Sequence, residues 1–103
     1  MNLKNKKVLI IGTGISGIAA ADLLSEEGAK VFLFDANAEL QEEKIRERLK
    51  PETVCEIVLG ELTDTYYKNT ELLVLSPGVP TDLPMVERFK MFVKNDPSSE
   101  KRY

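Results

Sequence analysis

A glycine-rich turn directly after a short, wholly apolar run is the feature that most constrains this chain. Residues 8–11 read Val-Leu-Ile-Ile, and residues 12–17 read Gly-Thr-Gly-Ile-Ser-Gly. A short apolar run that ends at glycine is typical of a strand buried on both faces of a parallel sheet. The pattern G-x-G-x-x-G, placed between a strand and a helix, is typical of a βαβ unit that binds a phosphate group. We therefore expect a parallel α/β fold with an anion site at this turn.

The residues after the glycine turn have the spacing of an amphipathic helix. We expect this helix over residues 15–27, with Gly28 ending it in the left-handed conformation that glycine adopts without strain. The helical spacing predicts that its apolar side consists of Ile15, Ile18, Ala19, Leu23 and Leu24.

The rest of the chain continues the alternation of strands and helices. We predict, in order, a strand over residues 31–34 closed by Asp35, a surface helix over 38–49 capped by Asn37, a strand over 54–59, a connection with a short helical turn over 60–68, and a strand over 72–75. Strands that alternate with helices in this way predict a Rossmann-like, doubly wound parallel sheet of about four strands.

The end of the chain has a different character. Two prolines and a glycine in residues 76–80, Ser-Pro-Gly-Val-Pro, prevent the last strand from continuing, and Asp82 can cap one further helix. Residues 95–103 have no apolar periodicity. We therefore predict one domain over residues 1–94 and a disordered tail over residues 95–103.

Composition excludes several classes of function. A chain of 103 residues builds one compact core, and its net charge of -3 is not gathered into a block of one sign, so we expect no nucleic-acid partner. Cys55 is the single cysteine and histidine is absent, which argues against a disulfide or a zinc site and for a cytoplasmic protein. No segment has the ~20 apolar residues of a membrane span, so we expect no membrane partner.

Each glycine of the turn has a distinct physical task. Gly12 permits the tight turn, Gly14 lets a phosphate approach the backbone, and Gly17 lets the helix pack closely on the strand. Unpaired N–H groups of the first helical turn then point at the anion. The alternative is that the three glycines only form a tight corner between strand and helix.

Other candidate residues lie at the same edge of the predicted sheet. Asp35 ends the second strand, where an acid commonly accepts a hydrogen bond from a nucleoside hydroxyl, although a capping role is also open. The Ser76-Pro77-Gly78 segment either forms a second wall of the cleft or is a structural turn. We interpret Cys55 as a small core residue and Tyr66 and Tyr67 as cover for the sheet.

Catalytic machinery is missing from the sequence. It contains no G-x-x-x-x-G-K-[ST] loop, no histidine base and no pair of carboxylates spaced for metal or acid–base work. We therefore predict no catalytic residue and no metal ligand in this chain.

Four segments together resemble the start of a Mur ligase: residues 8–21, 33–35, 59–60 and 75–80. The Ser-Pro-Gly-Val-Pro segment is the most specific of them, and the resemblance covers residues 6–86. It implies a Rossmann-like N-terminal domain that binds the UDP of the substrate, followed in the family by an ATPase domain and a C-terminal domain. By resemblance, the residues that contact UDP are Gly14, Ile15, Ser16 and Gly17 at the diphosphate, Asp35, Ala36 and Asn37 around the uracil, and Gly78 at the pocket edge.

The resemblance is to the D-glutamate-adding branch of that family. It implies that the whole enzyme joins D-glutamate to UDP-N-acetylmuramoyl-L-alanine through an acyl phosphate made from ATP, in peptidoglycan synthesis. This chain would only hold the substrate, and ATP and Mg²⁺ would bind the other ligase domains. Two alternatives stay open from the residues alone: the NAD- or FAD-binding half of an oxidoreductase, and a regulatory nucleotide-sensing domain.

Overall fold

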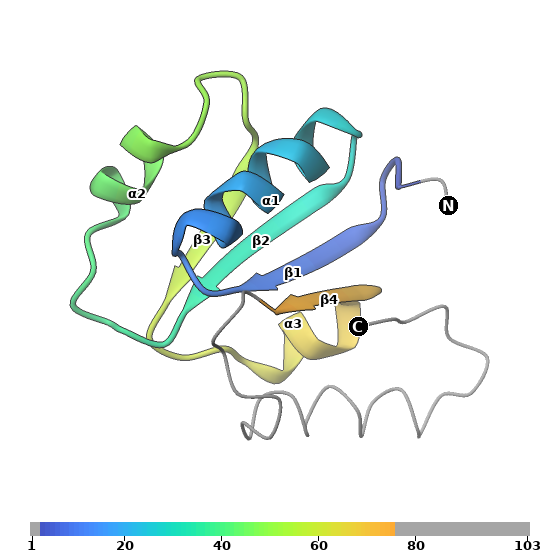
Figure 1. Ribbon diagram of the computed structural model, residues 1–103. Coiled ribbons are helices and arrows are strands. Elements are labelled where there is room, and N and C mark those ends of the chain that lie inside the picture. The colour runs from blue at the N-terminus through green and yellow to red at the C-terminus, as the bar shows by residue number, and fades with distance from the viewer. Residues whose placement is uncertain (1–2, 76–103) are drawn as a thin grey trace.

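A computed structural model describes residues 3–75 and shows one parallel sheet with the strand order β3-β2-β1-β4 (Figure 1). The strands are β1 (Lys7–Ile11), β2 (Lys30–Asp35), β3 (Cys55–Leu59) and β4 (Leu72–Leu75). In register, Ile10 of β1 lies beside Leu33 of β2 and Val74 of β4. The predicted α/β fold and its four strands are confirmed.

Helices cover both faces of this sheet. They are α1 (Ile15–Glu26), α2 (Glu42–Arg48) and α3 (Asp64–Asn69). In Figure 1, α1 and α2 lie on one side of the sheet and α3 lies on the other. The chain runs outward from β1 to β2 and β3 and then crosses to β4 on the far side of β1. Because strand order reverses beside β1, the glycine turn at the carboxyl end of β1 lies where doubly wound sheets bind ligands.

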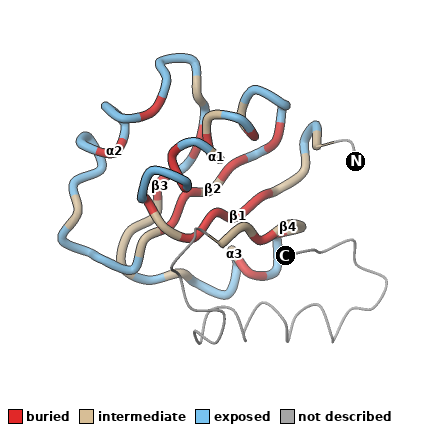
Figure 2. Tube along the Cα trace, viewed as in Figure 1, coloured by how far each residue is buried: buried red, intermediate tan, exposed pale blue. Residues whose placement is uncertain are grey.

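The core consists of two apolar layers, one on each face of the sheet. Val8 and Ile10 pack with α1 residues on one face, whereas Leu9 and Ile11 pack with Tyr67 of α3 on the other. Figure 2 shows β1 largely buried, and because neighbouring residues of a strand point to opposite faces, both of its sides are covered. Cys55 lies in the first layer, as predicted for a core residue.

The predicted apolar side of α1 was partly wrong. Ile18 and Leu24 are buried as expected, together with Gly17 and Ala21. Ile15 and Leu23 are instead 86% and 58% exposed, and Ala19 is exposed as well. Positions 17, 21 and 24 follow one face of a helix, and positions 15, 19 and 23 follow the opposite one. The small residues Gly17 and Ala21 face the sheet because they allow close approach, so hydrophobicity alone placed Ile15, Ala19 and Leu23 on the wrong side.

The second helix also starts later than predicted. Asn37 does not cap it: the Asn37 Oδ1 accepts a hydrogen bond from the Glu39 N–H at 3.0 Å, which closes a local turn. The helix begins at Glu42 with Gln41 as its N-cap. An asparagine side chain stabilises such a turn and a helix start by the same kind of bond, so its sequence signature does not separate the two.

Several predictions concern parts of the chain outside the described residues. These are the Ser-Pro-Gly-Val-Pro segment with Gly78, the helix capped by Asp82, the limit of the domain at residue 94 and the tail over residues 95–103. Within residues 3–75, no helix combines the length and the hydropathy that crossing a membrane requires.

Candidate functional site

The candidate site is built around the turn between β1 and α1. Gly12 has a φ of 107°, a conformation that residues with a side chain rarely adopt, and its N–H donates to the Phe34 carbonyl at 2.7 Å. The chain can therefore leave β1 and enter α1 almost at once. This places the start of α1 at the carboxyl edge of the sheet.

No side chain among residues 3–75 caps the N-terminus of α1. Its N-cap is Gly14, which has no side chain to cap the helix, and no acidic residue lies in the first turn. The first helical hydrogen bond runs from the Ile18 N–H to the Gly14 carbonyl at 3.0 Å. Within the described part of the chain, the N–H groups of residues 14–17 have no acceptor. Such a row of unpaired donors, at the positive end of a helix dipole, favours an anion.

Gly14 is a glycine that neither its conformation nor internal packing requires. Its φ of -73° and ψ of -173° are open to any residue, so the backbone does not demand glycine. Among residues 3–75, nothing lies within 4 Å of a Cβ placed on Gly14. The described residues therefore leave the space in front of Gly14 open, and a side chain at this position would occupy it.

Asp35 at the end of β2 ties the glycine turn to the neighbouring strand. Its Oδ2 accepts hydrogen bonds from the Thr13 hydroxyl at 2.8 Å and from the Thr13 N–H at 3.2 Å. Its Oδ1 accepts from the Asn37 N–H at 3.0 Å. A carboxylate has about four acceptor positions, so these three bonds leave room for one more donor. Asp35 thus supports the turn, and its proposed contact with a nucleoside stays a prediction.

The other predicted contact residues lie on the exposed edge of the same region. Ile15, Ser16, Ala36 and Asn37 are all exposed, whereas Gly17 is buried. The Thr13–Asp35 bonds bring the glycine turn and the segment after β2 together at one edge. The structure thus joins two of the three predicted groups of contact residues, and the third, Gly78, lies outside the described residues.

Gly60, the residue after β3, holds the segment that follows β2 in place. Its φ is 92°, and its N–H donates to the Asp35 carbonyl at 2.8 Å. A Cβ on Gly60 would lie 3.0 Å from the Ala38 Cβ, which is tighter than an ordinary contact. The close approach therefore requires glycine here and fixes the start of the loop that carries Ala36 and Asn37.

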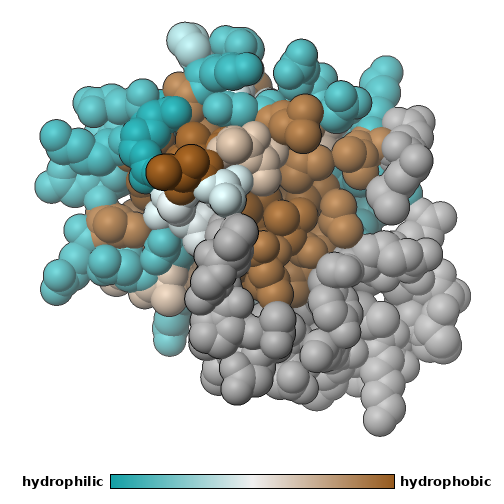
Figure 3. All heavy atoms as spheres, viewed as in Figure 1, coloured by the Kyte–Doolittle hydropathy of each residue, from teal (hydrophilic) through white to brown (hydrophobic). Residues whose placement is uncertain are grey.

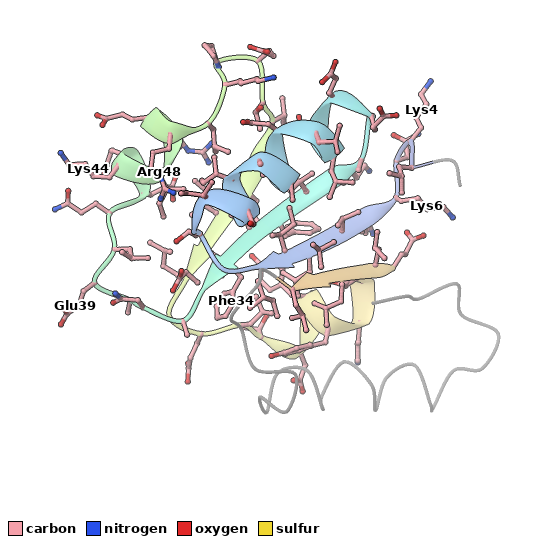
Figure 4. All side chains as sticks on the ribbon, viewed as in Figure 1. Lys4, Lys6, Phe34, Glu39, Lys44 and Arg48 are labelled. Carbon is pink, nitrogen blue, oxygen red and sulfur yellow. The ribbon has the colours of Figure 1, made fainter. Side chains whose placement is uncertain are left out.

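Sequence reasoning missed Arg48, which approaches the site from α2. Its guanidinium Nη1 donates a hydrogen bond to the Thr13 carbonyl at 2.8 Å, across 35 residues of sequence. Figure 4 shows Arg48 reaching from α2 toward the start of α1. On the face drawn in Figure 3, hydrophilic side chains gather over α2, and hydrophobic ones lie over α1, β1 and β4. The sequence held no local signal for Arg48, because the contact depends on how α2 packs.

The titratable groups with shifted pKa values lie away from this edge. Burial raises the pKa of the Cys55 thiol, which makes it a poor nucleophile at neutral pH. The pKa of Tyr66 is raised chiefly because its hydroxyl donates to the Glu56 carboxylate at 3.0 Å. Among residues 3–75, no group of three or more His, Cys, Asp or Glu side chains is arranged to hold a metal ion.

Comparison with known proteins decides between the families that share this geometry. A family model for the N-terminal domain of MurD-like Mur ligases matches residues 6–92. The chain belongs to this family. The MurD-like domain is 47% identical over 90 residues to the UDP-N-acetylmuramoylalanine--D-glutamate ligase of Lachnospira eligens, a match that covers 87% of this chain and 20% of the relative.

Two further relatives carry the same ligase name. The protein from Lachnoclostridium phytofermentans is 47% identical and that from Caldanaerobacter subterraneus subsp. tengcongensis 39% identical, each over 90 residues, 87% of this chain and 20% of the relative. The chain therefore spans about a fifth of the length of these relatives. It is the N-terminal domain of a MurD-type ligase in fold and family, so the predicted family resemblance is confirmed.

Proposed function

We propose that this MurD-like domain binds the UDP part of UDP-N-acetylmuramoyl-L-alanine, with the diphosphate at the N-terminus of α1. The relatives that the chain matches are UDP-N-acetylmuramoylalanine--D-glutamate ligases. The site offers donors that suit a diphosphate: the N–H groups of residues 14–17, which have no acceptor among the described residues. The buried single thiol of Cys55 suits a cytoplasmic protein.

The observation that carries the proposal is the open space at Gly14. Gly12 is explained by its positive φ and Gly60 by its contact with Ala38, whereas neither the backbone conformation of Gly14 nor its packing against residues 3–75 requires glycine. A group from outside the described residues that needs to reach the backbone explains it, because any side chain at this position would stand in the way. A phosphate is such a group, and the adjacent donors match its oxygens.

The neighbouring segment supplies a place for the nucleoside. Asp35 keeps about one acceptor position after its three internal hydrogen bonds, and Ala36 and Asn37 are exposed beside it. We assign the uracil to this segment. Gly78 remains part of the proposed pocket edge.

Within a complete ligase, this domain would hold the nucleotide substrate while other domains bind ATP and Mg²⁺ and form the bond to D-glutamate. The described part of the site contains no histidine or cysteine, and the Asp35 carboxylate is engaged by Thr13 and Asn37. The part of the reaction that we propose for these residues is therefore binding and orientation of the substrate, without proton transfer.

A titration of the full 103-residue chain tests the proposal. We expect UDP to shift the amide NMR signals of residues 14–17 and 35–37 in a saturable manner, with a dissociation constant of about 1 mM or weaker, because contacts from other domains are lacking. NADH at the same concentrations serves as the comparison ligand. Saturable shifts with NADH and none with UDP would replace the proposal by the dinucleotide-binding alternative.

A further inference from the structure

Arg48 is held at the end of α2 in a way that directs its side chain to the glycine turn. It is the last residue of α2. Ile45, one helical turn earlier, and Leu49, the next residue, are both buried, with exposed fractions of 3% and 8%. The buried pair anchors this end of α2 to the core, while the Arg48 side chain itself is exposed. Its guanidinium nevertheless makes a hydrogen bond of 2.8 Å to the Thr13 carbonyl.

Thr13 is clamped from two sides. Its N–H and hydroxyl both donate to the Asp35 carboxylate, and its carbonyl accepts from Arg48. Thr13 is only 6% exposed, so little water reaches these polar groups to replace a lost hydrogen-bond partner. The peptide unit that follows Thr13 is therefore fixed at its carbonyl end by a charged donor.

That same peptide unit carries the Gly14 N–H. In a trans peptide the C=O and the N–H point in opposite directions, so a donor that holds the Thr13 carbonyl on one side turns the Gly14 N–H toward the other. A cation that bonds to the carbonyl also polarises the amide and makes its N–H a stronger donor. The Gly14 N–H has no acceptor among the described residues.

We propose that Arg48 is a positioning residue for the diphosphate: it acts through the Thr13–Gly14 peptide, orienting and strengthening the Gly14 N–H that receives a phosphate oxygen. This inference rests on the proposed function. The competing explanation is that the Arg48–Thr13 bond only fastens α2 to the rest of the fold, and the two explanations predict different results for ligand binding.

The decisive comparison is between Arg48→Met and Lys44→Met in the full chain. Both changes remove one positive charge from α2 and keep an apolar stem, but the Lys44 side chain is exposed and has no hydrogen bond within residues 3–75. We expect Arg48→Met to weaken UDP binding by about threefold to tenfold, the effect of one lost hydrogen bond. Lys44→Met should leave the affinity within about twofold, because its charge lies farther from the turn and is screened.

Two further measurements separate positioning from fastening. In the free chain, the Gly14 amide signal should move in Arg48→Met and stay in place in Lys44→Met. Arg48→Lys keeps the charge and one N–H donor, so it should return both the Gly14 signal and the UDP affinity toward the original values. A fastening role would lower the unfolding temperature without changing the UDP affinity of the folded protein.

The failures of the two proposals are distinguishable. If the unchanged chain does not respond to UDP, the proposed function falls and the role of Arg48 falls with it. If the unchanged chain binds UDP and Arg48→Met binds as tightly as Lys44→Met, only the role of Arg48 is overturned. If Arg48→Met does not fold, Arg48→Gln against Lys44→Gln replaces the pair, with the same expected difference in affinity.

Discussion

The two ends of α1 differ in how their backbone groups are satisfied. At the C-terminal end, Gly28 adopts a φ of 87°, its N–H donates to the Ser25 carbonyl at 3.0 Å, and the Ala29 N–H donates to the Leu24 carbonyl at 3.1 Å. At the N-terminal end, Gly14 supplies no cap and the following amides have no acceptor within the described residues.

The C-terminal half of α1 is also tied to the loop between α2 and β3. The Asp22 carboxylate accepts hydrogen bonds from the Lys50 N–H at 3.0 Å and the Thr53 hydroxyl at 2.7 Å. The Ser25 hydroxyl accepts from the Val54 N–H at 2.9 Å. Within residues 3–75, α1 is thus closed by the chain at its C-terminal end and left without acceptors at its N-terminal end. This is the difference expected if the C-terminal end serves the fold and the N-terminal end binds the ligand that we propose.

The variant with the largest expected effect tests the N-terminal end of α1. Gly14→Val places a side chain where a phosphate is proposed to approach, so it should weaken UDP binding by about tenfold to hundredfold, the effect of one lost charge-assisted hydrogen bond. The amide NMR titration described above measures this. Ala19→Val, which adds the same branched side chain at an exposed position of α1, should leave the affinity unchanged. Equal affinities for both variants would show that no ligand approaches Gly14.

The second prediction tests the closed end. Gly28→Ala should lower the free energy of unfolding by about 1–2 kcal/mol, because alanine at a positive φ is strained. Chemical denaturation measures this change. Gly28→Asn should cost less, since asparagine tolerates the left-handed conformation better. UDP binding by the folded Gly28→Ala protein should be unaltered; a clear loss of affinity would mean that the two ends are not independent.

The third prediction concerns a negative charge added at the N-terminal end of α1. Ser16→Asp adds an acid to the first turn of α1, where it should stabilise the fold by about 0.3–1 kcal/mol through the helix dipole. The same charge should repel a diphosphate and weaken UDP binding, so stability and affinity should move in opposite directions. Ser16→Asn is the neutral reference. A rise in both stability and UDP affinity, or a fall in both, would contradict an anion site at this turn.

The smallest expected effect concerns pH at the closed end. Desolvation raises the pKa of Asp22, but the Thr53 hydroxyl, the Lys50 N–H and the Lys50 charge together lower it further, so the net pKa lies below the usual value. Asp22 therefore stabilises the fold above the pKa of an unfolded aspartate, about 3.9, and this contribution is lost as the pH falls through its folded pKa. Unfolding curves measured below pH 5 detect the loss.

Asp22→Asn is the control for this pH dependence. The amide oxygen still accepts hydrogen bonds from the Lys50 N–H and the Thr53 hydroxyl, but it does not titrate. The variant should therefore lose less stability than the unchanged chain as the solution is made more acidic. If both proteins lose the same stability on acidification, the loss is due to carboxylates other than Asp22.

Local patterns predicted much of this fold correctly. The apolar runs indicated all four strands, and Gly28 marked the end of α1, because burial on both faces of a strand and a left-handed helix end each leave a signature within a few residues. The glycine turn was likewise visible from its spacing. Its role as a UDP site stays a prediction that the geometry supports.

Features decided by distant packing, or by competition between two local arrangements, were not predictable in the same way. The exposure of Ile15 and Leu23 follows from which side of α1 fits the sheet, and small residues on the other side decided it. Asn37 closes a turn because its side chain bonds locally to Glu39, which leaves Gln41 as the cap of α2. Both outcomes result from competition between alternatives with similar sequence signals.

The sequence by itself determined the order of strands and helices, the parallel α/β class and the place of the glycine turn, since these depend on hydrophobic periodicity and on the backbone freedom of glycine. Only the tertiary structure decided that Asp35 and Arg48 hold Thr13 from two sides, across 22 and 35 residues. Packing brings such partners together, and no spacing in the sequence encodes the distance between them.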